Sequence, residues 1–244
     1  MEVQVFFSPG EIKESVVRGK TVVVIDVLRA STTIITAIAN GARGVIPAKS
    51  IEDATEMVSK LSMDDVLLCA ERDMERVEGC DLGNSPAEYT RERVEGRLLV
   101  LSTSNGSRAV VASQSARQVI VGGYVNAGRV IREIAKRDEL VIACAGQHEG
   151  FSLEDTACAG FILHHLKQET GRDILPLNDG AWVAIELGRK TPKSPIRMIR
   201  RAAHSRRLEA AGYGSDLALC AAVDSHPVLP VLKDHIIVSS DRVS

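Results

Sequence analysis

The chain has 244 residues, of which 45% are hydrophobic and only 3% aromatic, so its core must be mainly aliphatic. Lys and Arg total 30 and Asp and Glu total 32, which excludes the basic field typical of nucleic-acid-binding proteins. No apolar run approaches the roughly 20 residues of a membrane-spanning helix, and the N-terminus lacks the features of a secretion signal. The simplest prediction is a cytoplasmic protein that binds neither nucleic acid nor membrane.

In chain order, the hydrophobic pattern predicts alternating strands and helices. Strands are predicted over residues 3–7, 21–28, 44–48, 66–70, 97–103, 118–122, 139–145 and 235–239. Helices are predicted over residues 31–40, 51–61, 126–136, 152–169, 179–188, 196–211 and 216–223, with a short one from 108, a shaped loop over 71–95 and a break over 191–195. This alternation predicts an α/β fold, layered α/β/α around a largely parallel or mixed sheet.

Four of the apolar runs stop abruptly at polar clusters. Residues 21–25 end at Asp26, residues 66–70 at Glu71-Arg72, residues 98–101 at Ser102, and residues 140–145 at Gly146. Short apolar runs without polar alternation are typical of strands that are buried on both faces of a parallel sheet. If the four strands are parallel, their polar clusters lie along one edge of the sheet, where open α/β folds bind ligands.

The cluster Ser102-Thr-Ser104-Asn105-Gly106-Ser107-Arg108 indicates an anion site. It follows a strand and opens a helix, so hydroxyls, an amide, a guanidinium and free backbone N–H groups converge there. It lacks the Lys of a P-loop and the glycine pattern of a dinucleotide site. The alternative is an ordinary helix cap, which needs fewer polar residues than this cluster has.

Asp26, in the cluster Asp26-Val-Leu-Arg29-Ala-Ser31-Thr32, is a candidate magnesium ligand, because Mg²⁺ prefers oxygen ligands and often joins a protein carboxylate to a phosphate. A covalent aspartyl nucleophile is less well supported, since phosphatases of that kind use Asp-x-Asp and position 28 is Leu. Asp26 can also be a buried acid paired with Arg29 or Arg72.

The sequence Ser152-Leu-Glu154-Asp155 has the form of a capping box at the start of a helix. Acidic residues in a first turn also interact favourably with the helix dipole, so Glu154 and Asp155 have a purely structural interpretation as well as a chemical one. His148 stands beside this cluster, and a surface role is favoured for it over catalysis.

Taken in order, these blocks resemble the 2-phosphosulfolactate phosphatase family over nearly the whole chain. The resemblance is carried by Asp26-Val-Leu-Arg29-Ala-Ser31-Thr32-Thr33, Glu71-Arg72, Gly79-Cys-Asp-Leu-Gly83-Asn84-Ser85-Pro86, Thr103-Ser-Asn105-Gly106, Cys144-Ala-Gly146, Ser152-Leu-Glu154-Asp155 and Gly212-Tyr-Gly-Ser-Asp216-Leu. It implies a Mg²⁺-dependent phosphatase that converts (R)-2-phospho-3-sulfolactate to 3-sulfolactate and phosphate, on the route to coenzyme M. It also implies two related α/β halves, so the chain is either one compact unit over residues 1–244 or two subdomains with a boundary near residues 125–175.

The resulting hypothesis assigns roles to the residues of these blocks. Catalysis is expected from Asp26, Arg29, Glu71 and Asp155, and magnesium binding from Asp26, Glu71, Glu154 and Asp155. Substrate and phosphate binding is expected from Arg29, Ser31, Thr32, Arg72, Asn84, Ser85, Ser104, Asn105, Gly106, Ser107 and Arg108. One carboxylate of the same set would act as general base, and which one stays open.

Two other functions use the same residues. A non-catalytic sensor or carrier of a small phosphorylated or sulfonated acid would need the anion sites but no metal carboxylates. A phosphotransferase would pass the phosphoryl group to an acceptor other than water. Assembly as a homo-oligomer is also open.

Overall fold

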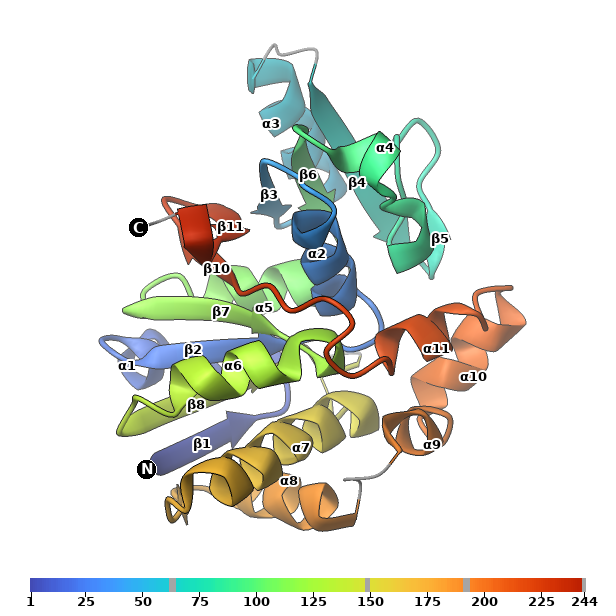
Figure 1. The fold of residues 1–244 in the computed structure, drawn as a ribbon. Helices are drawn as coiled ribbons and strands as arrows, with labels where there is room; N and C mark the ends of the chain where they lie inside the picture. The colour runs from blue at the N-terminus through green and yellow to red at the C-terminus, as the bar shows by residue number, and fades with distance from the viewer. Residues whose placement is uncertain (62–64, 148–149, 191–193, 243–244) are drawn as a thin grey trace.

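The computed structural model describes residues 1–61, 65–147, 150–190 and 194–242 and has the layered α/β architecture that the sequence predicts (Figure 1). The strands are β1 (Glu2–Phe6), β2 (Thr21–Ile25), β3 (Gly44–Ala48), β4 (Val66–Arg72), β5 (Glu75–Arg76), β6 (Leu98–Ser102), β7 (Gln118–Gly122), β8 (Glu139–Cys144), β9 (Leu175–Pro176), β10 (Pro230–Lys233) and β11 (Ile236–Ser239). The helices are α1 (Glu14–Val17), α2 (Ala30–Ala39), α3 (Ile51–Leu61), α4 (Arg91–Val94), α5 (Gly106–Ala112), α6 (Ala127–Ile134), α7 (Leu153–Thr170), α8 (Asp179–Lys190), α9 (Pro195–Ile199), α10 (Ala203–Ala210) and α11 (Asp216–Cys220).

Within the described residues, one sheet of 11 strands has the order β5-β4-β6-β3-β11-β10-β7-β2-β8-β1-β9. It contains two blocks of parallel strands, β4-β6-β3 and β7-β2-β8-β1-β9. The hairpin β10-β11 lies between the blocks and pairs antiparallel with both. In Figure 1, β4 runs downward and β1 runs to the right, so the carboxyl ends of both blocks approach the same region.

The apolar strands have no polar alternation because helices cover both faces of the sheet. In β2, Val22 and Val24 belong to the core cluster that includes Ile34 and Ile35 of α2. Val23 and Ile25 point to the other face, into the cluster that α6, α7 and α8 complete (Figure 1). Successive side chains of a strand point to opposite faces, so Val22 and Val24 are buried on one face of the sheet and Val23 and Ile25 on the other.

The structure corrects four predicted elements. The strand predicted over 21–28 ends at Ile25, because residues 26–29 turn away from the sheet toward α2. The helix predicted over 196–211 is broken into α9 and α10. The strand predicted over 235–239 is one half of a hairpin, and its other strand, β10, was not predicted. The loop predicted over 71–95 also contains the short strand β5 and the short helix α4. Residues 191–193 of the predicted break, and His148, lie outside the described residues.

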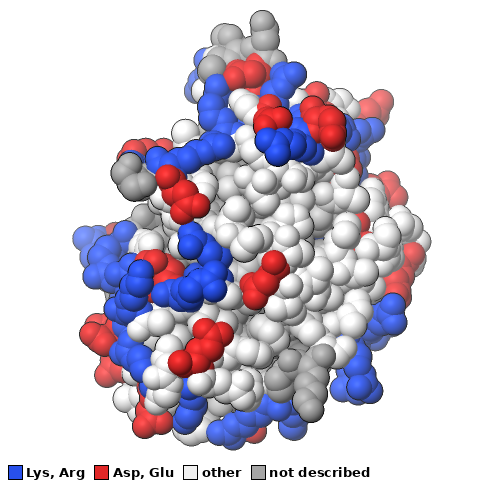
Figure 2. Space-filling view, viewed as in Figure 1, with Lys and Arg blue, Asp and Glu red and all other residues white. Residues whose placement is uncertain are grey.

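The block β7-β2-β8-β1-β9 is built from discontinuous parts of the chain, because β3, β4 and β6 of the other block come between β2 and β7. The boundary near residues 125–175 stays a prediction. Among the residues that the structure describes, we find no helix with the length and hydrophobicity that crossing a bilayer requires. On the face in Figure 2, basic and acidic side chains lie close together around a broad uncharged area.

Candidate active site

A small pocket, of about 70 Å³, lies where the carboxyl ends of β2, β4, β6 and β8 meet. Its lining includes Asp26 after β2, Glu71 on β4, Thr103 after β6 and Gln147 after β8. The four strand ends thus meet at one pocket, but the premise that all four strands are parallel is wrong. Three antiparallel pairings through β10 and β11 make the block of β2 and β8 run opposite to the block of β4 and β6. The complete lining is Asp26, Leu28, Arg29, Glu71, Asp73, Met74, Asn84, Thr103, Ser104, Asn105, Gln147, His204 and Arg207.

Asp26 is the buried acid of this pocket, with 7% of its surface exposed. Burial raises the pKa of Asp26 to about 7, against an opposing effect of His204 and with smaller contributions from Glu154 and Glu71 in the same direction as burial. Its backbone is fixed because the Asp26 N–H donates to Ser31 Oγ at 2.9 Å. Burial thus makes this carboxyl a weaker acid than an exposed aspartate.

Gly106 allows the loop after β6 to approach Asp26. A Cβ atom at position 106 would lie 2.5 Å from Asp26 Oδ2 and would also clash with the side chain of Ala30. Gly106 is buried at the start of α5. The loops after β2 and β6, which belong to different blocks, therefore pack directly against each other.

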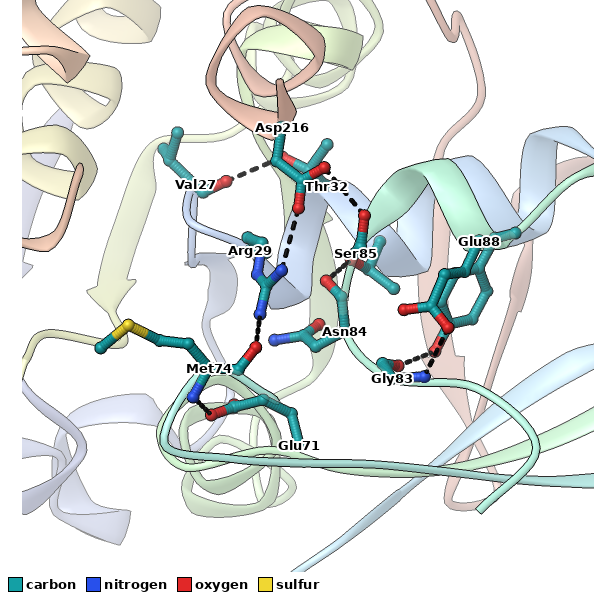
Figure 3. Close-up of polar contacts among 12 residues, drawn as sticks. Val27, Arg29, Thr32, Glu71, Met74, Gly83, Asn84, Ser85, Glu88 and Asp216 are labelled. Carbon is teal, nitrogen blue, oxygen red and sulfur yellow. Dashed lines mark hydrogen bonds and ion pairs between the residues drawn. The ribbon is translucent and has the colours of Figure 1, made fainter. Parts of the chain in front are cut away.

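Arg29 is held in place by groups from two distant segments, of which Figure 3 shows Met74 and Asp216. Its Nη1 donates to Asp216 Oδ2 at 2.9 Å, its Nη2 donates to the carbonyl of Met74 at 2.6 Å, and its guanidinium carbon lies 4.3 Å from the centre of the Tyr213 ring. Ser85 Oγ donates to the other oxygen of Asp216 at 2.8 Å. Arg29 and Asp216 are both almost completely buried, so this ion pair gives Arg29 a fixed position at the pocket wall.

Glu71 and Asn84 line the pocket on either side of Met74. Glu71 Oε1 accepts from the Met74 N–H at 2.7 Å and from Ser104 Oγ at 3.4 Å. Asn84 is 5% exposed, and its Oδ1 is buried with no hydrogen-bond partner in the described structure. In Figure 3 the Asn84 amide extends from the loop after Gly83 toward Arg29 and Met74. An unpaired buried oxygen in a pocket indicates a place for a donor or a cation that is supplied from outside the chain.

Asp155 joins the loops after β2 and β8. Its Oδ1 accepts from the Val27 N–H at 2.8 Å, and its Oδ2 accepts from the Gly146 N–H at 3.2 Å. Ser152 Oγ caps α7 by accepting from the Asp155 N–H at 3.2 Å, which confirms the predicted cap. Burial raises the pKa of Asp155 well above its usual range. Both carboxylate oxygens are thus engaged with backbone beside the pocket, and Asp155 is not among the residues that line it.

The remaining predicted acid, Glu154, pairs with a residue of a helix, His204, rather than with a group at the end of a strand. Its Oε1 lies 3.3 Å from Nδ1 of His204 on α10, and only 3% of the Glu154 side chain is exposed. His204 and Arg207 both line the pocket. The sequence analysis names neither His204 nor Arg207 as a site residue, because the segment is polar throughout and its pattern does not show which side is turned to the pocket.

Several predicted binding hydroxyls are instead used to shape the loops. Thr32 Oγ1 donates to the Val27 carbonyl at 3.0 Å, and Ser31 Oγ accepts from Asp26. Ser107 Oγ donates to the Thr103 carbonyl and accepts from the Thr103 N–H. Ser31, Thr32, Ser85 and Ser107 do not line the pocket, whereas Ser104 and Asn105 do.

Arg72 and Arg108 lie outside this pocket, in a neighbouring one of about 260 Å³. Lys49, which sequence reasoning also missed, contributes the third cation there. The two pockets share Glu71, Thr103 and Ser104, so they are adjacent. The three predicted anion-binding arginines are thus divided between two pockets, with Arg29 in the first and Arg72 and Arg108 in the second.

The oxygen donors of the first pocket are compatible with magnesium. Among the described residues there is no group of three or more His, Cys, Asp or Glu side chains arranged to hold a metal ion. Mg²⁺, however, is usually held by one or two carboxylates together with waters and substrate phosphate. Asp26, Glu71 and Asn84 would supply oxygens of this kind, because all three line the pocket, whereas Asp155 and Glu154 do not.

Comparison with known proteins identifies the family. Residues 6–235 match the family described as 2-phosphosulpholactate phosphatase. The chain belongs to this family. The predicted resemblance to the 2-phosphosulfolactate phosphatases is therefore confirmed, and the blocks that carried it are the ones that surround Asp26 and Arg29.

Curated relatives of similar length bear the name "Probable 2-phosphosulfolactate phosphatase". The protein of Caldanaerobacter subterraneus subsp. tengcongensis is 36% identical, over 98% of this chain and 99% of its own. The relative from Thermotoga maritima is 35% identical over 92% of this chain and 94% of its own, and that from Symbiobacterium thermophilum is 39% identical over 90% and 94%. A phosphatase of this name is a phosphoric monoester hydrolase.

Proposed function

We propose that this protein is a Mg²⁺-dependent phosphatase that hydrolyses (R)-2-phospho-3-sulfolactate to 3-sulfolactate and phosphate, a step toward coenzyme M where that cofactor is made. The observation that supports this most directly is the Asp26 pocket. A buried acid with a pKa of about 7 lies beside a fixed guanidinium, a second carboxylate and an unpaired amide oxygen. The family's name supports the choice of substrate.

Asp26 and Glu71 would hold the magnesium ion, with Asn84 Oδ1 as a further oxygen donor. When bound, Mg²⁺ supplies positive charge that stabilises the phosphoryl oxygens in the transition state. Asp155 contributes from outside the pocket, because it fixes the backbone on both sides of the strand ends that carry Asp26 and Gly146.

Arg29 binds a phosphoryl oxygen from its fixed position, and Arg207 adds positive charge on the α10 side of the pocket. The contacts of Arg29 with Asp216 and Met74 remain in place during the reaction, so little reorganisation is needed as negative charge develops. A carboxylate of the same pocket accepts the proton of the attacking water.

Phosphate release from a panel of 2-phospho acids, measured with Mg²⁺ and with EDTA, tests this proposal. We expect turnover that requires Mg²⁺ and is fastest with (R)-2-phospho-3-sulfolactate. Tight binding of the substrate without phosphate release would instead support a sensor or carrier. Release that depends on an added alcohol acceptor would support a phosphotransferase.

A further inference from the structure

The pocket that neighbours the Asp26 pocket differs from it in charge. Three cationic side chains line it, Lys49 after β3, Arg72 at the end of β4 and Arg108 on α5, together with one acid, Glu71. The Asp26 pocket, in contrast, is lined by Asp26, Glu71 and Asp73 as well as by Arg29, His204 and Arg207. The second pocket, here called the Lys49 pocket, therefore has an excess of positive charge.

The Asp26 pocket is small on its own, at about 70 Å³. The Lys49 pocket adds about 260 Å³ next to it, and small-molecule sites occupy roughly 300–1,000 Å³.

A substrate that occupies both pockets would lie across the residues that the two pockets share. Thr103 and Ser104, which follow β6, line both pockets, as does Glu71. Ser104 Oγ donates to Glu71 Oε1 at 3.4 Å, so this wall is polar. A molecule whose phosphoryl group lies beside Asp26 thus has its remaining substituents directed over Ser104 toward the cations.

Two acids near Lys49 and Arg72 do not enter the Lys49 pocket. Asp53 accepts from the backbone N–H of Lys49 at 2.9 Å rather than from its side chain. The exposed Glu52 interacts electrostatically with Arg72, but Glu52 and Asp53 do not line the pocket. Lys49 and Arg72 are both exposed, so they can move onto a ligand.

We infer that the Lys49 pocket binds a second anionic group of the substrate, a sulfonate or carboxylate on the carbon next to the phosphorylated one. This inference rests on the proposed phosphatase function and extends it. The Asp26 pocket selects the phosphoryl group, and the Lys49 pocket selects 2-phospho acids that carry this further charge. Lys49 thereby becomes a specificity residue, in contact with a part of the substrate that does not react.

Kinetics of Lys49→Gln with matched substrates tests this role. With 2-phospho-3-sulfolactate we expect KM to rise about fivefold, the effect of losing one partly exposed ion pair, and kcat to change little. With 2-phospholactate, which has a hydrogen in place of the sulfonate, KM should stay the same. Equal effects on both substrates would overturn the inference. 2-Phosphomalate, which has a carboxylate there, separates the two kinds of anion.

Two controls accompany this experiment. Lys233→Gln removes an exposed lysine of β10 that lines neither pocket, and it should change neither KM. Calorimetry with 3-sulfolactate tests the pocket without turnover: the wild-type protein should bind it, and Lys49→Gln should bind it about fivefold more weakly. If wild type releases no phosphate, the proposed function fails, but this binding difference still supports the pocket. Equal affinities, or no binding by wild type, would refute it.

Discussion

Asp26 combines burial with a position at the point where two strand-end loops meet. Its carboxyl lies against Gly106 and within electrostatic reach of His204, Glu154 and Glu71. Such a group is costly to bury, and proteins place these groups mainly where chemistry requires them. The role of Asp26 can therefore be separated from folding by a substitution that keeps its shape.

We expect Asp26→Asn to lower kcat by at least about 100-fold, because the variant loses the charge that would hold the cation and balance the transition state. The fold should be retained, since the amide has the same size and no buried charge remains to be solvated. Phosphate release and circular dichroism of the purified variant measure the two effects. Near-normal turnover would remove Asp26 from the mechanism.

Asp216 is expected to stabilise the protein through Arg29. In Asp216→Ala, the buried guanidinium loses its carboxylate, and breaking one side of a buried ion pair costs about 3–5 kcal/mol of unfolding free energy. Denaturant unfolding measures this loss. Asp241→Ala is the matched control, because it removes an ion pair with Arg129 at 3.1 Å in which Asp241 is 71% exposed. It should cost less than about 1 kcal/mol, and similar losses in both variants would contradict the argument.

At the scale of elements, α7 and α8 approach each other through two glycines. A Cβ atom at Gly188 of α8 would clash with the backbone of Gly160 on α7, and one at Gly160 would clash with the Ala184 carbonyl. Because α7 begins with Ser152 and Asp155, its packing against α8 also fixes the loops behind the pocket. Glycine is thus required at this helix crossing for space rather than for an unusual backbone conformation.

We expect Gly188→Ala to destabilise the protein by roughly 1–3 kcal/mol, because the two helices must move apart to accept a methyl group. The midpoint of chemical denaturation reports the change. Gly10→Ala is the control, since an added Cβ at Gly10 would have its nearest neighbour, Ser8 Oγ, at 4.0 Å. If the two variants were equally stable, the close helix packing would be in doubt.

Strands that are local apolar runs can be predicted from the sequence, whereas strands that depend on distant partners cannot. Strands such as residues 44–48 and 118–122 are local apolar runs, and both match the structure. The second strand of the C-terminal hairpin was missed because β10 has four residues, starts with Pro230 and gains its hydrogen bonds from β7 and β11. A pairing of that kind leaves little signal in the local pattern.

The site is predicted less completely than the fold, for the same physical reason. Glu71 lies at the end of β4 and Ser104 follows β6, so parallel strand ends alone place these two together. That argument does not bring Asp26 to them, because β2 belongs to a block that runs in the opposite direction. Asp216 reaches Arg29 from 187 residues further along the chain, and although its block contributes to the family resemblance, nothing in that block predicts the ion pair with Arg29. His204 lies in a polar helix whose orientation depends on the packing of α9 and α10. Residues of this kind are found only when the tertiary structure is known.

At the scale of the whole molecule, four of the five cysteines are buried in the core, so their reactivity measures how rarely the core is exposed to solvent. Burial raises the pKa of Cys69 and Cys220 to about 12, and burial raises the pKa of Cys144 and Cys158 well above the usual range. Cys80 is partly exposed, and burial raises the pKa of its thiol as well. Because the thiolate is the reactive form, buried thiols should stay inert at pH 8.

We therefore expect a thiol reagent at pH 8 to modify one cysteine of the native protein, and all five after denaturation. Counting the modified thiols by mass spectrometry measures this. Cys80→Ser should abolish the native reaction while leaving four reactive thiols in denaturant. Rapid modification of Cys69 or Cys220 in the native state would show that the core opens more readily than its burial suggests.

The position of the hairpin has a consequence for biosynthesis. The ribosome makes both parallel blocks before it makes β10 and β11, yet these strands are the ones that connect the blocks in the sheet. A nascent chain that ends before residue 230 thus has two sheets with unpaired edges at β3 and β7, and such edges invite pairing with other chains. Until residues 230–239 have left the exit tunnel, these two edges therefore stay open to pairing with other chains.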